Sequence, residues 1–599
     1  MNTSNQIVEV VPLVTLPPQG NQKFSYLVPE NIFVFPGTLV KIPFANRIIE
    51  GVVWRQSKSS YSNLKTIIGV EKQQVVTLKD IEWLEKFSCA SFESLSLVTK
   101  TLVLNRKFST ELCFPKQTSP KKRGSIKFKF KENELDKSIK EAPSGQVLVL
   151  IPEIIMGNKV LEVCKTNRRI CLFYNTQLSQ KEKTETISAI TKNESCVIVA
   201  THSGIFLPFS NLVTIILLEP ALSSHRQWNM HPHYDARIGA YLKSKLQKIP
   251  LIHISILPSF DLYSSRKMKV GSLGLKNIIV LNKNWDESSF ISKETINLIR
   301  LNINQGKKIL IYHNAIGYES LYVCRDCGNT LRCEQCGTIL QRQTRDLFCK
   351  TCKSIKGSLR AFCNKCGSPK LNALKHGTHS VEQSLKREFP QLNILRIDRD
   401  TKQINTPTQS LVDANIVIAT QKIFSTIDSK IFDYCIIPDF TSIVNSTSFS
   451  ALEETLITLK RLYGLIKNST EKLIYIEDSN GSSGIINYIK NNKIDELIKN
   501  DLRDRKELWF PPYALLMTCE KEFTSEILAQ KEILKIKAKI SLNCISTKIN
   551  TLIYKRRTKF VGQIIFRGQH QIIRESIKYV PSSWSIDAPL SLNDIIKLN

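Results

Sequence analysis

The sequence lacks the two kinds of segment that would send a chain into or across a membrane. No run of about 18 consecutive apolar residues, the length that spans a bilayer, occurs in its 599 residues. Its first residues, MNTSNQIVEVVPLVTL, have no basic stretch followed by a continuous apolar core, so they do not resemble a secretory leader. We therefore expect a cytoplasmic protein with no membrane partner.

Acidic residues are also few. The chain has 53 Asp and Glu against 84 Lys and Arg, which gives a net charge of +31. Such an excess favours a polyanionic partner such as DNA, although abundant Lys, Asn and Ile can equally reflect an AT-rich genome. The hydrophobic content of 42% is that of a globular protein, and the length is enough for several domains.

Half of the sixteen cysteines lie in one block, as the four pairs CRDC, CEQC, CKTC and CNKC. A disulfide framework is not expected in a reducing compartment, and redox CxxC motifs come singly near a βαβ unit. Two CxxC pairs complete a tetrahedral zinc site that leaves no position for water, so the site is structural. We predict two zinc ions, held by Cys324, Cys327, Cys333, Cys336, Cys349, Cys352, Cys363 and Cys366. The spacing fits adjacent and nested pairing alike, and His376 and His379 are expected to be ordinary surface or loop residues.

Outside the cysteine block, short β-branched apolar runs alternate with polar, helix-compatible segments. Such runs are typical of buried parallel strands, and there are enough for two sheets. They are VLVLI at 147, CVIVAT at 196, TIILL at 214, LIHISIL at 251, ILIYH at 309, IVIAT at 416, YCII at 434 and LIYI at 473. The first 75 residues alternate as strands broken by Pro and Gly, which predicts a small β module. The basic stretch PKQTSPKKRGSIKFKFK that follows is expected to be an exposed linker.

The order of several motifs resembles the PriA family of bacterial replication restart proteins. FSYLVP, PGTLVKIPF and GVVW resemble its N-terminal module, which captures the 3′ end of a nascent strand. QVLVLIPEI, ATHSGIFLPFSNLVTII and HYDARIGA resemble its first helicase lobe. HNAIGYESLYVCRDCG with the four cysteine pairs, GTHSVEQSLKREFP and LRIDRDT resemble its zinc insertion and second lobe. RKELWFPPYALL and WSIDAPLSL resemble its C-terminal domain.

The resemblance implies a multidomain α/β fold. Its expected parts are a 3′-end-binding-like module at 1–110, a basic linker at 111–140, RecA-like lobes at 141–300 and 301–500, and an α+β C-terminal domain at 501–599. The second lobe would carry the two-zinc insertion at 324–366. The family's nested pairing would place Cys324, Cys327, Cys363 and Cys366 on one ion, and Cys333, Cys336, Cys349 and Cys352 on the other.

The resemblance also implies DNA-binding residues at both ends of the chain. Phe24, Tyr26, Gly37 and Lys65 match the family's strand-end pocket, with aromatic faces for a base and a lysine for phosphate. Ser25 stands where the family usually has Asp, which weakens selection of the 3′-terminal nucleotide. For both aromatic residues, ordinary barrel core is an equally good interpretation.

The C-terminal segment YKRRTKF and the later IIFRGQHQIIR mix basic, aromatic and apolar residues. Arg556, Arg557 and Arg567 in this segment would suit a surface that follows the DNA backbone. A solvated cationic strand face is the alternative.

The family's phosphate-handling motifs are not found in the sequence. It has no GxxxxGK[ST] string, and neither ELDKSIKEAPSG nor PEIIMGNKV supplies such a loop. The DEEH-like box is replaced by Leu218, Glu219, Pro220 and Ala221, and the coupling motif by Ser255, Ile256 and Leu257. Leu465 and Asn468 stand where the family has arginine fingers, and loss of a finger alone costs about 10³ to 10⁵ in rate. We therefore predict a helicase-shaped protein that is not an enzyme and does not use ATP.

The expected function is recognition of stalled or abandoned replication forks and nucleation of primosome assembly. The partners would be forked or junction DNA and the primosome and helicase-loading proteins. One alternative is an ATP-dependent 3′-to-5′ DNA helicase with diverged motifs. The other is a zinc-dependent assembly protein without DNA affinity.

Overall fold

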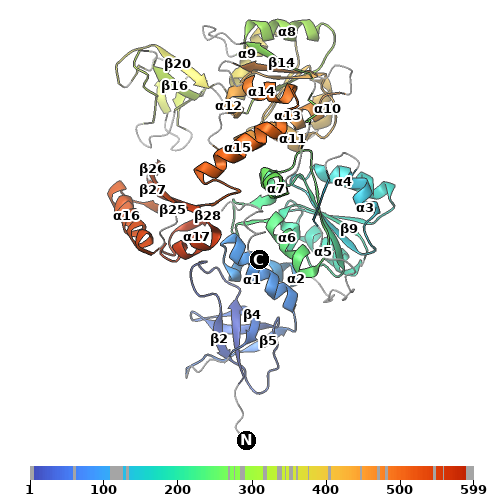
Figure 1. Ribbon diagram of the computed structural model, residues 1–599, viewed down its shortest axis with the longest axis vertical. Helices are drawn as coiled ribbons and strands as arrows, with labels where there is room; N and C mark the ends of the chain where they lie inside the picture. The colour runs from blue at the N-terminus through green and yellow to red at the C-terminus, as the bar shows by residue number, and fades with distance from the viewer. Residues whose placement is uncertain are drawn as a thin grey trace.

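Figure 1 shows the computed structural model, with a small N-terminal sheet at the bottom, one α/β lobe at the right, a second lobe at the top and a C-terminal sheet at the left. The structure describes residues 6–587 except 58–62, 108–125, 130–133, 194, 267–269, 271, 276, 283–290, 315–319, 325, 334–339, 344–345, 350–354, 359–361, 364, 376, 402–406, 445–447, 468–472, 479–482, 544–547 and 557–558. No helix in these ranges is long and apolar enough to cross a membrane.

The N-terminal module is a five-stranded antiparallel sheet in the order β2-β1-β4-β3-β5, as the alternating pattern predicted. Its strands are β1 (Ile7–Pro12), β2 (Phe24–Leu27), β3 (Leu39–Phe44), β4 (Arg47–Gln56) and β5 (Gly69–Lys72). Two helices follow, α1 (Leu78–Ser91) and α2 (Leu95–Lys107). Helix α1 begins with a capping box, in which the Thr77 hydroxyl accepts from the Asp80 amide and the Asp80 carboxylate accepts from the Thr77 amide.

The first lobe is built on a six-stranded parallel sheet in the order β6-β13-β10-β7-β9-β8. Its strands are β6 (Ile126–Lys129), β7 (Gln146–Leu150), β8 (Cys171–Tyr174), β9 (Val197–Ala200), β10 (Leu212–Leu218) and β13 (Leu251–Ile254). Helices α3 (Glu134–Lys140), α4 (Met156–Thr166), α5 (Gln180–Lys192) and α6 (Ala236–Gln247) accompany it, together with the short pair β11 (Arg226–Gln227) and β12 (Tyr234–Asp235) and the turns η1 (His202–Phe206) and η2 (Ser223–His225). Part of the segment expected to be a linker therefore forms the edge strand β6 and helix α3.

The second lobe has a six-stranded parallel sheet in the order β14-β24-β23-β15-β22-β21. Its strands are β14 (Ile278–Asn282), β15 (Ile309–Tyr312), β21 (Ile394–Ile397), β22 (Ile416–Ala419), β23 (Tyr434–Ile437) and β24 (Leu473–Asp478). Its helices are α7 (Phe260–Arg266), α8 (Lys293–Ile303), α9 (Thr378–Glu388), α10 (Pro407–Asp413), α11 (Ile423–Thr426), α12 (Phe440–Val444), α13 (Ala451–Gly464), α14 (Ser483–Lys490) and α15 (Ile494–Leu508). The prediction of an α/β fold with two parallel sheets is confirmed.

Two further sheets complete the fold. The cysteine block forms an antiparallel sheet after β15, with β16 (Ser320–Cys324), β17 (Gln341–Gln343), β18 (Asp346–Phe348), β19 (Ile355–Ser358) and β20 (Leu371–Lys375). The C-terminal sheet has the order β26-β27-β25-β28 and carries α16 (Glu526–Asn543) and α17 (His570–Ile577). Its strands are β25 (Leu515–Phe523), β26 (Lys548–Arg556), β27 (Lys559–Gly568) and β28 (Ser585–Asp587).

One apolar core runs from the N-terminal helices through the first lobe into the C-terminal sheet. At its centre Trp83 of α1 stacks on Phe87 with ring centroids 4.9 Å apart and meets Phe206 edge-on at 5.6 Å. The Trp83 indole donates to the Gly239 carbonyl in α6 at 3.0 Å. A Cβ at Gly239 would lie 2.8 Å from the Ile205 side chain, so glycine permits this close packing of α1 on α6.

Candidate metal centre and nucleic-acid interface

Four of the eight predicted zinc ligands come together at one end of the β16–β20 sheet. The ligand atoms of Cys324, Cys327, Cys363 and Cys366 all lie within 4.8 Å of one another. The sulfur atoms of Cys324 and Cys366 are 3.5 Å apart, and those of Cys327 and Cys363 are 3.4 Å apart. Four thiolates at this spacing form a cluster that can bind a metal ion such as zinc.

The two CxxC turns of this cluster have the same backbone arrangement. In one, the amide of Gly328 donates to the carbonyl of Cys324, and in the other Gly367 donates to Cys363, each at 2.9 Å. Both glycines have positive φ, +70° and +72°, which a residue with a Cβ rarely adopts. Backbone N–H groups of Cys366 and Lys365 that point at Cys363 lower the pKa of its thiol to about 6. The thiolate, which is the metal-binding form, is therefore favoured.

The second predicted set of ligands is only partly described. Cys333 and Cys349 are both buried. Cys336 and Cys352 lie outside the described residues, as does His376, so the second zinc ion stays a prediction. His379 lies in the first turn of α9.

The two aromatic residues predicted for the strand-end pocket both lie on β2. Phe24 is half-buried and meets Phe44 edge-on, with ring centroids 5.0 Å apart. Tyr26 is 3% exposed, and its hydroxyl donates to the Pro43 carbonyl at 3.2 Å. Burial raises its pKa to about 12. The Tyr26 ring is therefore part of the barrel core, while half-buried Phe24 keeps some surface for a base.

The other two predicted pocket residues differ in role. Gly37 has φ +96°, and a Cβ there would lie 1.8 Å from the Val76 carbonyl oxygen, so packing within the module requires glycine. Lys65 is exposed, and its carbonyl accepts from the Leu27 amide in β2 at 3.0 Å. The Lys65 backbone is thus held beside the strand that carries Phe24, with its ammonium group in solvent.

Two of the three basic residues predicted at the C-terminal end are engaged in contacts within the protein. Arg556 of β26 donates to a carboxylate oxygen of Glu520 at 3.2 Å. Arg567 of β27 donates to the Leu508 carbonyl at 3.0 Å. Arg557 lies outside the described residues. Strand β26 is at the edge of its sheet and its side chains are mostly exposed, so the strand remains accessible to a nucleic-acid backbone.

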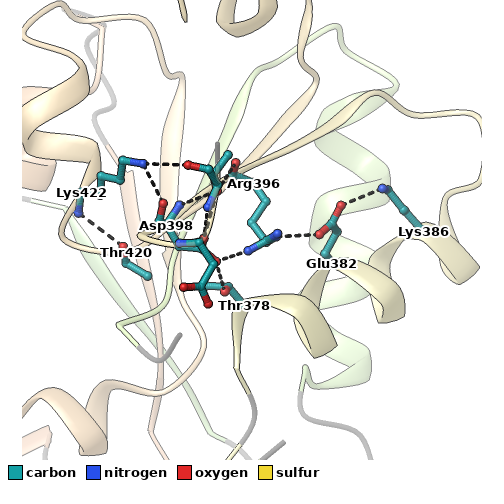
Figure 2. A network of polar contacts seen from close by, with 9 residues as sticks. Thr378, Glu382, Lys386, Arg396, Asp398, Thr420 and Lys422 are labelled. Atoms are coloured by element: carbon teal, nitrogen blue, oxygen red, sulfur yellow. Dashed lines mark hydrogen bonds and ion pairs between the residues drawn. The ribbon is translucent and has the colours of Figure 1, made fainter. Parts of the chain in front are cut away.

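A polar network fixes the carboxyl ends of β21 and β22 in the second lobe (Figure 2). Asp398 is fully buried and accepts from the Thr378 hydroxyl at 2.5 Å and from Arg396. Burial raises the pKa of Asp398, but the Thr378, Thr401 and Arg396 contacts outweigh it and leave the pKa below its usual value. Lys422 donates to the Asp398 carbonyl at 2.8 Å. The LRIDRDT motif thus shapes a polar rim at the carboxyl ends of the strands, the end at which open α/β sheets bind ligands.

The two lobes meet through an ion pair that the sequence did not reveal. Arg461 of α13 donates from both terminal nitrogens to Glu153, which follows β7 in the first lobe, and one of these distances is 3.1 Å. The exposed fractions of the two side chains are only 9% and 14%. The guanidinium carbon also lies 4.1 Å from the centroid of the Phe424 ring. Arg461 lies one helical turn before Leu465, the position where an arginine finger was expected. A basic residue that close to the expected position was the one signal for this contact in the sequence.

Glu219, the carboxylate left in the DEEH-like box, lies directly after β10. It accepts from the Ser255 hydroxyl at 3.0 Å and from the Ile256 amide at 3.1 Å. Burial raises its pKa to about 7, against the opposing influence of these bonds and of Arg461. A carboxyl group with a pKa near 7 is suited to general base catalysis. The remnants of the metal-binding box and of the coupling motif are therefore in direct contact.

Comparison with known proteins agrees with this arrangement. The family described as the 3′ DNA-binding domain (3′BD) of PriA matches residues 13–103. The replication restart protein PriA of Rickettsia conorii is 24% identical over 550 residues, which cover 82% of this chain and 84% of that protein. PriA of Thermotoga maritima is 26% identical over 394 residues, which cover 62% of this chain and 53% of its own. A solved structure of RecG bound to a three-way DNA junction has a TM-score of 0.37 and 13% identity, over 65% of this chain and 44% of that one.

The prediction that this chain is not an enzyme is contradicted by these similarities. The similarity to the PriA proteins, whose family has the helicase lobes that the sequence motifs resemble, extends over 82% of the chain. The prediction rested on exact motif strings, whereas Glu219 and Ser255, from two segments that it counted as lost motifs, are in contact. The resemblance predicted from the motifs is confirmed, because the chain is similar over most of its length to replication restart proteins named PriA.

Proposed function

We propose that this protein binds DNA at stalled or abandoned replication forks and nucleates assembly of the primosome there. The observation that carries the proposal is the match of residues 13–103 to a 3′ DNA-binding domain. That module is fused by a continuous apolar core to the first of two helicase-like lobes. A 3′ strand end held by the module would lie in a fixed position relative to the first lobe.

The charge of the chain supports DNA as the ligand. Its net charge of +31 favours association with phosphate, and the exposed Lys65 stands beside β2 in the matched module. Contacts of this kind position the protein on the backbone without reading sequence. Recognition would then depend on the shape of the fork, and helicase-loading proteins would be recruited to the bound complex.

Binding of a fork and of a plain duplex of equal length tests this proposal. With the full chain, we expect the fork with a free 3′ arm to bind at least about tenfold more tightly over a series of salt concentrations. Phosphate contacts weaken on both substrates as salt rises, whereas a preference for shape remains. Equal affinity for both substrates at every salt concentration would contradict fork recognition.

A second candidate function is that of an ATP-dependent DNA helicase, and the buried Glu219 favours it. The pKa of about 7 and the contact with Ser255 suit a base that activates water beside a coupling loop. DNA-stimulated release of phosphate from ATP is the direct test. We expect Glu219→Gln to lower that rate by about 10² to 10⁴, the usual contribution of a general base. No stimulated turnover by the unmodified chain would rule this candidate out.

A further inference from the structure

A second group of metal-binding side chains lies far from the cysteines, where three parts of the molecule meet. Glu93 is in the turn between α1 and α2, and His231 and His233 are in the loop between β11 and β12. One ligand atom from each of the three lies within 4.8 Å of the others. The two imidazole rings stack with centroids 4.0 Å apart, so both stand beside the same carboxylate.

The Glu93 carboxylate is a buried negative charge without a permanent cation. Glu93 is 7% exposed and accepts backbone N–H bonds from His233 at 2.6 Å and from Ser94 at 2.9 Å. In the described part of the chain no Lys or Arg pairs with it, and the ionisable groups beside it are the imidazoles of His231, at 3.0 Å, and of His233. Burial of a carboxylate is costly unless a cation or a metal ion compensates its charge.

His233 has a ring nitrogen that is available to a metal ion. Its Nδ1 atom is buried and has no hydrogen-bond partner. The ring is also hydrogen-bonded to the backbone of Ile586 in β28 of the C-terminal sheet. Since Nδ1 is unpartnered, the other ring nitrogen makes that bond and carries the proton, which leaves the Nδ1 lone pair free. A backbone bond of this kind commonly fixes the tautomer of a metal-bound histidine.

We propose that Glu93, His231 and His233 bind a divalent transition metal ion, with Zn²⁺ the best match to one carboxylate and two imidazoles. Bonds of about 2.0 to 2.2 Å place tetrahedral ligands about 3.4 Å apart, so the ligand atoms must close together and the exposed His231 ring must turn out of its stack on His233. The His231 side chain is 54% exposed and gives the ion a path from solvent. Three protein ligands leave a fourth position for water.

The location would let the ion join separate parts of the molecule. Glu93 belongs to the N-terminal helices, the histidines to the first lobe, and the Ile586 backbone that orients His233 to the C-terminal domain. Arg226, at the start of the same loop, also pairs with Asp587. A bound ion would join the first two parts directly and stiffen the contact with the third. This inference does not depend on the proposed function, because it rests on the local geometry alone.

Counting zinc in the full chain and in single variants tests the proposal. We expect His231→Asn and His233→Asn each to hold one zinc ion fewer per chain than the unmodified protein after equilibration with micromolar Zn²⁺. Loss of a direct ligand should weaken binding by more than about 100-fold, the upper range for residues that only support a ligand. Asn229→Ala, at an exposed position of the same loop, is the matched control and should retain every ion.

A cobalt substitution makes the test independent of the zinc held by cysteines. Co²⁺ bound to nitrogen and oxygen adds weak visible bands without the sulfur charge-transfer absorption of a thiolate site. We expect that component to disappear in both histidine variants and to persist in Asn229→Ala. Equal zinc content and identical cobalt spectra in all four proteins would overturn the proposal and leave a simple Glu93–His231 contact.

Discussion

The N-terminal module and the second lobe both attach to the first lobe, but through joints of different chemistry. The N-terminal joint is mainly aromatic, with Trp83 and Phe206 in contact inside one continuous core and the buried Lys243 ammonium of α6 4.1 Å from the Trp83 ring centroid. The joint between the lobes adds charge to its apolar contacts, because Arg461 and Glu153 pair across it. An apolar joint loses buried surface as soon as it opens, whereas an ion pair can exchange its partner for water, salt or a phosphate group.

The difference between the two contacts indicates that the second lobe can move relative to the first lobe more easily than the N-terminal module can. The N-terminal module and the first lobe form one base, in which a bound strand end keeps its position. The second lobe, with the cysteine cluster, is attached through contacts that a charged ligand can replace. We therefore expect changes at the aromatic joint to affect stability and changes at the charged joint to affect the separation of the lobes.

The largest effect is expected from Trp83→Ala, which empties the centre of the N-terminal joint. Removal of a buried aromatic side chain costs about 3 to 5 kcal/mol of unfolding free energy. Urea unfolding monitored by far-UV circular dichroism, which does not depend on tryptophan fluorescence, measures this loss of unfolding free energy. The control is Lys86→Ala on the same helix, where an exposed pair with Glu82 should contribute less than about 0.5 kcal/mol. A loss below about 1 kcal/mol for Trp83→Ala would show that the joint is not a core.

The next largest effect is the pH dependence of the unfolding free energy that Glu219 causes. The charge of Arg461, in the ion pair between the lobes, acts on this carboxyl group. Its pKa is raised from 4.5 to about 7 in the folded state, so the folded protein binds the proton more tightly. The resulting stabilisation is fully present below pH 4.5 and is lost as the pH rises through about 7, a change of about 3 kcal/mol.

Glu219→Gln should remove this component of the pH dependence. We expect the unfolding free energies of the variant and the unmodified chain to diverge by about 3 kcal/mol between pH 4.5 and pH 8. Urea titrations at several pH values measure the divergence. Parallel pH profiles for the two proteins would mean that the carboxyl group titrates normally.

A smaller effect is expected at the ion pair itself. Arg461→Met and Glu153→Gln, alone and together, form a double-mutant cycle, and the coupling between two such side chains in contact should be about 1 to 3 kcal/mol. Solution X-ray scattering should show a larger radius of gyration for Arg461→Met because the lobes separate. Arg461→Lys is the control that keeps the charge but not the paired geometry. An additive cycle with unchanged scattering would mean that the lobes are held by other contacts.

The smallest effect is expected from Lys65→Ala on DNA binding. Loss of one phosphate contact should lower the slope of log affinity against log salt by about 0.9. Fluorescence anisotropy with a forked substrate measures the slope, and Lys79→Ala, at an exposed position of α1, is the control. Because Lys65 lies on the N-terminal module and away from the contact between the lobes, Lys65→Ala should lower the slope by the same amount with and without Arg461→Met. An unchanged slope would place the phosphate contacts elsewhere.

The sequence identified every central strand of the two parallel sheets and none of their edge strands. Strands buried on both faces are continuous apolar runs, so the sequence predicted all eight central strands. They are β7, β9, β10 and β13 in the first lobe and β15, β22, β23 and β24 in the second. The four that were missed, β6, β8, β14 and β21, are the edges of the same sheets. An edge strand is partly exposed and can include a charged residue such as Arg396 in β21, which conceals it in a pattern search.

Sites divide in the same way, by the distance along the chain between their members. The cysteine turns were found because each CxxC is local and its pattern is explicit. The Arg461–Glu153 pair joins residues 308 positions apart, and the Glu93–His231 contact joins residues 138 apart. No pattern in a single sequence connects such residues, since the fold alone brings them together. The pair His231 and His233 was visible as HPH, but without Glu93 it carried no indication of a metal site.

The central claim is that the N-terminal module directs this protein to a strand end at a fork. It is tested most directly by comparing the affinity of the full chain for two forks that differ only in whether a nascent 3′ end lies at the junction. Our account predicts at least about tenfold tighter binding to the fork with the 3′ end, at low and at high salt. Equal binding to the two forks would contradict it.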